Sequence, residues 1–215
     1  MKSNVKLVDV MGSDLTVVNA ARVSFAKRMS QFKPGRDDKL IRYLAKHGHW
    51  TPFGHVQLQF YIQAPVFVAR QLVKHQVGLV WNEVSRRYVD TEVEFYTPEY
   101  WREKAENKKQ GSGKNAVKNY ASWENKYDVL MTWTRDLYEE MLEGEVAPEQ
   151  ARMVLPQSMM TEWYWTGSLA AFARVCKLRN SEDAQAETRE VTAKIAEAIE
   201  TTPDLIISWG ALTDD

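Results

Sequence analysis

A strict alternation of apolar and polar side chains at residues 56–62 places the firmest constraint on how this chain can fold. The apolar members are Val56, Leu58, Phe60 and Ile62, and the residues between them are Gln57, Gln59 and Tyr61. Side chains of a β-strand point alternately to its two faces, so this period of two predicts a strand with one buried face. Pro65 follows, and because proline is tolerated in a first helical turn, we expect a helix over residues 66–76.

The other segments predict a mixture of strands and helices. Further strands are expected at 5–10, 88–96 and 160–165, and further helices at 36–48, 116–142, 168–178 and 183–200, with a short helix from Pro148 that ends before Pro156. Pro203 ends the last long helix, and a short amphipathic tail follows it. Loops are expected around Gly78 and, because of its charge and glycine content, at 102–114. With no internal repeat and no evident boundary, residues 1–215 are expected to form one α+β domain.

Composition limits the classes of partner. The chain of 215 residues is 44% hydrophobic and 27% charged, which allows a real core. Its formal net charge is −1, so no overall field attracts nucleic acid or an acidic membrane, and phosphate recognition must come from local arginines. No stretch approaches the ~20 apolar residues of a membrane helix. Residues 1–10 lack the features of a secretory signal, and the single cysteine, Cys176, cannot form an internal disulfide, so we expect a cytoplasmic protein.

The densest polar segment runs from residue 70 to residue 88. On a helix, Arg70 and Lys74 would stack along one side, as would Gln71 and His75, because each pair is four residues apart. The guanidinium groups and hydroxyl that follow are suited to phosphate or carboxylate. The alternative is a charged helix followed by a solvated loop, and composition alone does not decide between the two.

A second set of arginines lies in apolar surroundings in the C-terminal half. Arg152 is in the segment 149–157, and Arg174 and Arg179 are near the end of a predicted helix. Because an unpaired buried charge is costly, each needs a partner, which could be a structural carboxylate or a nucleotide.

Three other patterns are not interpreted as sites. His47, His49 and His55 are close in sequence but lack the accompanying ligand patterns of a metal site, so no metal is expected. The sequence GSGK at 111–114 lacks the full spacing of a phosphate-binding loop. Cys176 lies on an apolar helix face, so it is expected in the core rather than as a nucleophile.

The polar segment resembles that of flavin-dependent thymidylate synthases. That family carries an Arg-His-Arg triplet, then seven or eight residues, then a serine; here Lys74, His75 and Gln76 are followed by residues 77–84 and then Ser85. The sequence NEVSRRY at 82–88 is similar to the family's Asn-Glu-x-Ser-x-Arg-Tyr. Other similar segments follow in the same order over most of the chain, namely VMGSDLTVVNAARVSF at 10–25, KHGHWTPFGH at 46–55, APVFVARQ at 64–71, ARMVLP at 151–156 and LRN…DAQ at 178–185.

The resemblance implies a fold, a reaction and a set of partners. It implies an α+β fold with a central antiparallel sheet flanked by helices, assembled as a homotetramer whose active sites are built from several subunits. The implied reaction makes dTMP from dUMP, with methylenetetrahydrofolate as the carbon donor and NADPH reducing FAD, which supplies the hydride. No cysteine nucleophile is implied, in keeping with Cys176.

The resemblance also assigns roles to individual residues. The positions implied for dUMP are Gln71, Lys74, Ser85, Arg86, Arg87, Arg152 and Arg179. Arg179 is the implied catalytic residue, because a fixed cation there would stabilise negative charge on the pyrimidine ring. The positions implied for FAD are Thr51, Lys74, His75, Gln76, Glu83, Ser168 and Arg174.

This chain departs from the family pattern at several flavin positions. Lys74 and Gln76 replace both triplet arginines, Ser168 and Arg174 stand where asparagine is usual, and Asp183 stands where histidine can occur. Lysine and glutamine do not reproduce the planar fork of arginine. Two other hypotheses therefore stay open beside the synthase: a nucleotide-binding relative without flavin chemistry, and a flavin reductase or oxidase.

Overall fold

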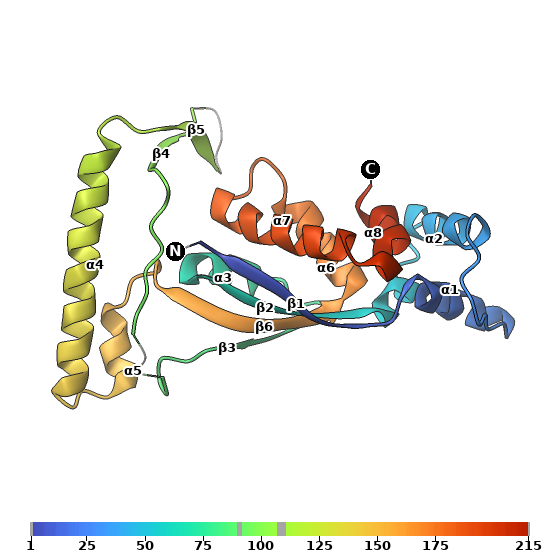
Figure 1. The fold of residues 1–215 in the computed structure, drawn as a ribbon, viewed down its shortest axis with the longest axis horizontal. Helices are drawn as coiled ribbons and strands as arrows, with labels where there is room; N and C mark the ends of the chain where they lie inside the picture. Colours follow the sequence, from blue (N-terminus) through green and yellow to red (C-terminus); the bar gives the residue numbers. More distant parts are fainter. Residues whose placement is uncertain (1, 90–91, 107–110, 215) are drawn as a thin grey trace.

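The fold is organised around an antiparallel sheet of four strands, in the order β1-β2-β6-β3. The computed structural model describes residues 2–89, 92–106 and 111–214. The strands are β1 (Asn4–Met11), β2 (Gln57–Pro65), β6 (Met160–Ser168) and β3 (Leu79–Glu83). The predicted strands at 5–10, 56–62 and 160–165 are confirmed, and all three are longer than the sequence indicated. The α+β class with a central antiparallel sheet is thus confirmed (Figure 1).

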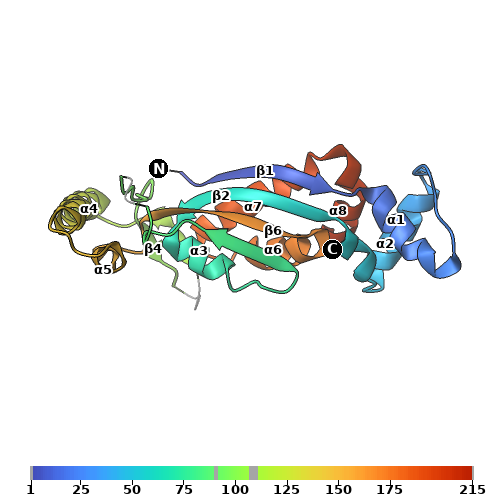
Figure 2. The same cartoon turned by 90° about the horizontal axis from the view of Figure 1, so that it is seen from below.

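Helices lie along one face of this sheet and at its two ends (Figures 1 and 2). The longer ones are α1 (Asp14–Arg22), α2 (Arg36–Lys46), α3 (Val66–Leu72), α4 (Tyr120–Glu143), α6 (Leu169–Arg179), α7 (Ala186–Glu200) and α8 (Ile206–Thr213). The shorter elements are α5 (Pro148–Ala151), η1 (Val23–Phe25), η2 (Thr51–His55), η3 (Arg152–Val154) and η4 (Pro203–Leu205). Helices α6 and α7 lie along one face of the sheet, α1, α2 and α8 gather at one end, and α4 with α5 stands apart at the other (Figures 1 and 2). Within the described residues, no helix is both long and apolar enough to cross a membrane.

The core lies between the sheet and the helices α6 and α7. The antiparallel register sets Phe60 opposite Trp165, and both side chains are fully buried. Phe172 of α6 packs edge-on against both rings, with centroid distances of 5.0 and 5.3 Å. Trp81 of β3 stacks on Trp163 at 4.4 Å. Burying each such ring stabilises the fold by roughly 2–3 kcal/mol, so these aromatic contacts hold α6 on the central strand pair and reinforce the pairing of β3 with β6.

Several sequence predictions are wrong in detail. The expected strand at 88–96 is absent from residues 88–89 and 92–96, which form only an isolated bridge between Phe95 and Met159; residues 90–91 lie outside the described part. Gly78 lies in a turn, as expected, but the residues that follow it in the expected loop form β3, which pairs with β6. The helix expected at 66–76 ends at Leu72. Helix α1 was not predicted.

The expected surface loop at 102–114 also contains secondary structure. It includes β4 (Arg102–Lys104) and the start of β5 (Ser112–Ala116), which pair antiparallel. Residues 107–110 of the expected loop lie outside the described part. Composition alone misassigned this segment, because a short hairpin can be made of charged residues when its edges face water.

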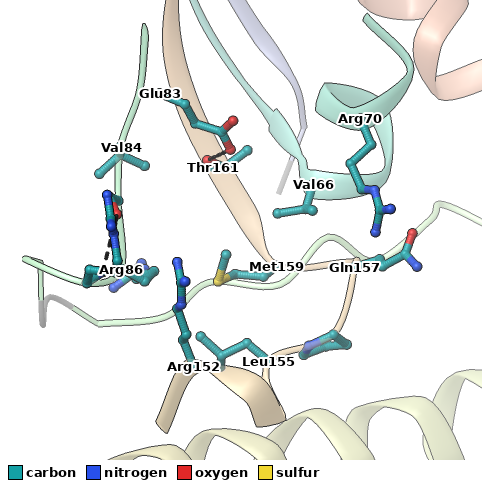
Figure 3. Close-up of a pocket in the computed structure, with 13 residues that line it drawn as sticks. Val66, Arg70, Glu83, Val84, Arg86, Arg152, Leu155, Gln157, Met159 and Thr161 are labelled. Atoms are coloured by element: carbon teal, nitrogen blue, oxygen red, sulfur yellow. Dashed lines mark hydrogen bonds between the residues drawn. The ribbon is translucent and has the colours of Figure 1, made fainter. Parts of the chain in front are cut away.

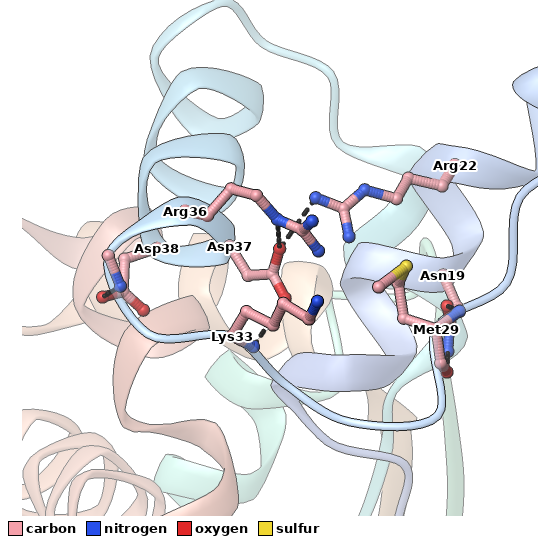
Figure 4. Close-up of polar contacts among 8 residues, drawn as sticks. Asn19, Arg22, Met29, Lys33, Arg36, Asp37 and Asp38 are labelled. Carbon is pink, nitrogen blue, oxygen red and sulfur yellow. Dashed lines mark hydrogen bonds and ion pairs between the residues drawn. The ribbon is translucent and has the colours of Figure 1, made fainter.

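A buried carboxylate fixes the segment between α1 and α2 (Figure 4). Asp37 is fully buried and accepts hydrogen bonds from Arg22 at 2.7 Å, Arg36 at 3.1 Å and the Lys33 backbone N–H at 2.8 Å. Asn19 holds the same segment through both backbone groups of Met29. Burial alone would raise the pKa of Asp37, but these hydrogen bonds outweigh it and hold the pKa below its usual value.

We expect Asp37→Asn to destabilise the protein by roughly 3 kcal/mol, because it leaves the Arg22 guanidinium without its anionic partner. In the wild type, a lowered pKa means that this stability is present above the unfolded-state pKa and is lost as pH falls through the folded-state value. Urea unfolding at several pH values measures both effects. The control is Arg42→Ala, since its pair with Asp214 is exposed and long at 3.8 Å. Equal stability of the two variants would contradict the prediction.

Candidate functional site

A cavity of about 520 Å³ is lined by four arginines from three segments of the chain. Arg70 comes from α3, Arg86 and Arg87 follow β3, and Arg152 begins η3. Figure 3 shows Arg70, Arg86 and Arg152 extending into the space between these segments. We call this cavity, with Ser85 on its wall, the arginine pocket. Its concentration of positive charge suits a phosphorylated ligand.

The local contacts of Arg87 and Arg152 orient these two cations without neutralising them. Arg87 donates through Nε to the Ser85 hydroxyl at 3.3 Å and lies over the Tyr88 ring at 4.9 Å. Arg152 donates to the Glu149 carbonyl at 3.3 Å. In the described part of the chain, neither Arg87 nor Arg152 pairs with a carboxylate. Since guanidinium groups so placed still have free donors, they can grip an anion.

One carboxylate also lines the arginine pocket. Glu83, at the end of β3, accepts from the Thr161 hydroxyl at 2.7 Å and from Trp81 Nε1 at 3.2 Å. Both donors are neutral, so they fix the direction of the carboxylate without forming an ion pair with it. Sequence reasoning missed Thr161. Its signal was its place in β6, where a threonine takes the inward register otherwise held by Trp163 and Trp165.

A second cationic group is built along α6. The segment His75–Gly78 runs beside this helix in the opposite direction: His75 meets Arg179, Val77 meets Arg174 and Gly78 meets Ser168. Gly78 has a φ of +76°, and a Cβ there would lie 3.3 Å from Ala171 Cβ, so glycine suits this close approach. We call His75, Arg174 and Arg179 the His75 cluster.

The His75 cluster favours a neutral imidazole. Arg179 Nε donates to His75 Nε2 at 3.0 Å, so Nε2 is an acceptor and the ring proton lies on Nδ1. Burial lowers the pKa of His75, and the positive charges of Arg179 and then Arg174 lower it further. No carboxylate pairs with Arg174 or Arg179 among the described residues. Uncompensated charge beside a neutral ring fits the pyrophosphate and ring system of a dinucleotide.

The structure separates residues that the sequence grouped together. Because α3 ends at Leu72, Lys74 and His75 lie beyond it, and the predicted stacking of Arg70 with Lys74 and of Gln71 with His75 along one helix is wrong. Arg70 lines the arginine pocket, whereas Gln71 hydrogen bonds to Gln185 and to α7. None of the His75 cluster lines the arginine pocket.

The other predicted flavin positions are distributed around the His75 cluster and the end of the sheet. Lys74 and Gln76 lie on either side of His75. Thr51 is exposed at the start of η2. Ser168 is buried and caps α6 by accepting from the Ala171 N–H at 3.2 Å, so helix capping already uses one lone pair of its hydroxyl.

His47 and Cys176, which were not interpreted as site residues from the sequence, have structural contacts. His47 Nδ1 lies 2.8 Å from the Tyr43 carbonyl, and its ring packs on that of Tyr43 at 4.1 Å. In the part of the chain that the structure describes, no group of three His, Cys, Asp or Glu side chains is placed to hold a metal. Cys176 is buried, and burial raises the pKa of its thiol to about 12, so it is not a nucleophile at neutral pH.

We expect Arg179→Met to raise the pKa of His75 towards its ordinary value, because the substitution removes the nearer of two positive charges while keeping the helix. Titration of the imidazole protons by NMR measures this shift. Lys177→Met, on the same helix but outside the cluster, is the control and should leave the His75 titration unchanged. The same upward shift in both variants would show that Arg179 does not act directly on the ring.

Comparisons with known proteins identify the family. Residues 6–203 match the thymidylate synthase complementing protein family. The flavin-dependent thymidylate synthase of Thermosipho africanus is 40% identical over 204 residues, covering 91% of this chain and 85% of that protein. The Thermus thermophilus enzyme of the same name is 38% identical, covering 99% of this chain and 76% of that protein. Among solved structures, the UMP/dUMP methylase PolB from Streptomyces cacaoi, bound with 5-Br dUMP, has a TM-score of 0.88 at 28% identity and covers 99% of this chain and 95% of that one. The chain therefore belongs to the thymidylate synthase complementing protein family.

Proposed function

We propose that this chain is a flavin-dependent thymidylate synthase that makes dTMP from dUMP. The observation that carries the proposal is the arginine pocket, where Arg87 and Arg152 keep donors that suit a nucleotide phosphate. Family membership supports it independently, because the relatives compared above are named for this reaction and the PolB structure holds a dUMP analogue. The protein is expected to act in a reducing cytoplasm, where its single thiol would stay reduced.

The chain's own residues would bind and polarise the nucleotide. Ser85, Arg86, Arg87 and Arg152 are proposed to hold the phosphate side, and Gln71, Lys74 and Arg179 to hold the pyrimidine and sugar. Arg179 is proposed as the catalytic residue: its fixed positive charge would stabilise negative charge that develops on the ring. Its contact with neutral His75 leaves that charge uncompensated, which makes it available to the substrate.

FAD would be held by Thr51, Lys74, His75, Gln76, Glu83, Ser168 and Arg174. Reduced FAD supplies the hydride, NADPH is the proposed reductant, and methylenetetrahydrofolate is the proposed carbon donor. The positive charges of Lys74 and Arg174 favour the cofactor pyrophosphate. The buried, capped start of α6 would keep water from one side of the site.

The proposed active site combines residues from different copies of the chain. In one copy, Arg87 lines the arginine pocket, whereas Arg179 belongs to the His75 cluster, none of whose residues lines that pocket. A homo-oligomer, which we propose to be a tetramer, would bring the arginine pocket of one copy to the His75 cluster of another. Each nucleotide would then contact both.

We expect the purified protein, incubated with FAD and freed of unbound ligand, to show oxidised-flavin absorption that bleaches with NADPH in the absence of air. It should then convert dUMP and methylenetetrahydrofolate to dTMP. A colourless protein that binds dUMP without forming dTMP would favour a non-catalytic nucleotide binder. NADPH oxidation indifferent to dUMP would favour a flavin reductase or oxidase.

The Lys74→Arg, Gln76→Arg double variant is the matched comparison for that spectrum. It restores two planar forks, so it should bind FAD more tightly than the wild type. If only this variant is yellow, the two departures have weakened the flavin site. If neither is, the flavin assignment is wrong.

We expect a mixture of two impaired variants to regain activity. Arg87→Ala and Arg179→Ala should each lower dTMP formation roughly 10- to 100-fold through loss of a charge-assisted contact. After subunit exchange, some sites would combine the intact Arg179 of one chain with the intact Arg87 of the other, so the rate should exceed the mean of the two variants. The control mixes Arg87→Ala with the Arg87→Ala, Arg179→Ala double variant, which supplies no intact Arg87. Unchanged rates in both mixtures would place the whole site within one chain.

A further inference from the structure

A chain of polar contacts connects the β4–β5 hairpin to Gln71. Ser112 accepts from Arg102 Nε at 2.7 Å, and Arg102 forms an ion pair with Glu187 in the first turn of α7. Glu187 in turn accepts from Gln185 Nε2 at 3.1 Å. Gln185 Oε1 accepts from Gln71 Nε2. The contacts therefore run without a break from a surface hairpin to a residue of the proposed nucleotide site.

The negative charge of Glu187 determines which group donates and which accepts in each of these hydrogen bonds. Glu187 is almost fully buried, at 5% exposure. Burial alone would raise the pKa of Glu187, but the hydrogen bond from Arg102 and other contacts outweigh burial and hold the pKa below its usual value. An ionised carboxylate only accepts hydrogen bonds, so the Gln185 amide must turn its NH₂ group towards Glu187 and its oxygen towards Gln71.

The orientation of the Gln185 amide in turn fixes that of the Gln71 amide. Facing an oxygen, the Gln71 amide must present its NH₂ group to Gln185, and its own oxygen accepts from the Thr188 hydroxyl at 3.1 Å. Thr188 is fully buried. An amide is nearly symmetric in shape, so packing alone would not select one of its two orientations. Here the negative charge of Glu187, acting through Gln185, selects the orientation of the Gln71 amide.

We infer that Glu187 is a positioning residue that fixes which edge of the Gln71 amide, donor or acceptor, faces the nucleotide. The inference rests on the proposed function, because the contact of Gln71 with dUMP is part of that proposal. A pyrimidine edge presents donors and acceptors in a set order, and an amide turned the wrong way would oppose like groups. Glu187 thereby contributes to affinity without touching the ligand.

Glu187→Gln tests the inference, since it keeps the shape of the side chain and lets both amides turn. We expect the dissociation constant of dUMP, measured by calorimetry, to rise roughly 3- to 10-fold, the value of one lost hydrogen bond. The matched control is Glu190→Gln on the same helix, whose pair with Lys194 at 2.7 Å is outside the chain of contacts. It should bind dUMP as the wild type does.

Two further variants separate positioning from folding. Glu187→Gln alone leaves the partly buried Arg102 guanidinium without its anionic partner, which should lower the melting temperature. The double variant Arg102→Met, Glu187→Gln removes that unpaired cation, so its melting temperature should recover while dUMP binding stays weak. In a Gln71→Ala background, Glu187→Gln should cause no additional loss, because the residue it positions is gone. Recovery of affinity together with stability, or an undiminished loss in the Gln71→Ala background, would overturn the inference. If the wild type itself does not bind dUMP, the proposed function fails instead.

Discussion

The pairing of β2 with β6 is the constraint on which the rest of the structure depends. The two strands are antiparallel over their whole length, with Gln57 opposite Ser168 and Pro65 opposite Met160. Each leads directly into a helix, β2 into α3 and β6 into α6, so the two helices begin at opposite ends of the sheet. Helix α6 and the segment that follows α3 therefore run past one another in opposite directions. Their crossing brings His75 to Arg179 although 104 residues separate them in sequence.

Buried and exposed charges have different roles in this arrangement. Two buried carboxylates, Asp37 and Glu187, have guanidinium partners, and a third, Asp14, accepts from the backbone N–H groups of Ile207 and Ser208. In contrast, Arg152 and Arg174 are exposed and, among the described residues, donate to backbone carbonyls rather than to carboxylates. Water solvates such cations at little cost until a ligand arrives. The fold thus provides partners for charge that is buried and keeps charge available where an anion is expected to bind.

The sequence predicted those features that depend on local patterns. The alternation at 56–62 predicted β2, and the fully apolar inner register of that strand explains why the prediction was reliable. Strand β3 was missed because its five residues have no clear period; they form a strand by pairing with β6, with Trp81 stacked on Trp163. Helix α3 was extended too far because the residues after Leu72 remain compatible with a helix. The helix ends there because the segment His75–Gly78 runs along α6 instead.

The candidate site shows the same limit more sharply. Motif spacing selected residues that line the arginine pocket and residues of the His75 cluster, but it could not show that they form two separate groups, because that follows from the sheet register. The supporting residues Thr161, Gln185 and Glu187 were given no role by any motif. Their signal is tertiary: a hydroxyl at an inward strand position, and an acidic side chain buried in the first turn of α7.

The exchange of the triplet arginines has a counterpart on α6. Lys74 retains one positive charge and Gln76 removes the other, so the triplet is one charge poorer than the family pattern. Arg174, where the family usually has asparagine, donates to the carbonyl of Val77, the residue directly after the triplet. It therefore supplies a guanidinium next to the triplet, which would offset the charge that Gln76 removes relative to that pattern. The charge is then carried by α6, where the side chains next to Arg174 are buried, instead of by the exposed turn of the triplet. A cation on a more rigid support loses less entropy when it binds an anion.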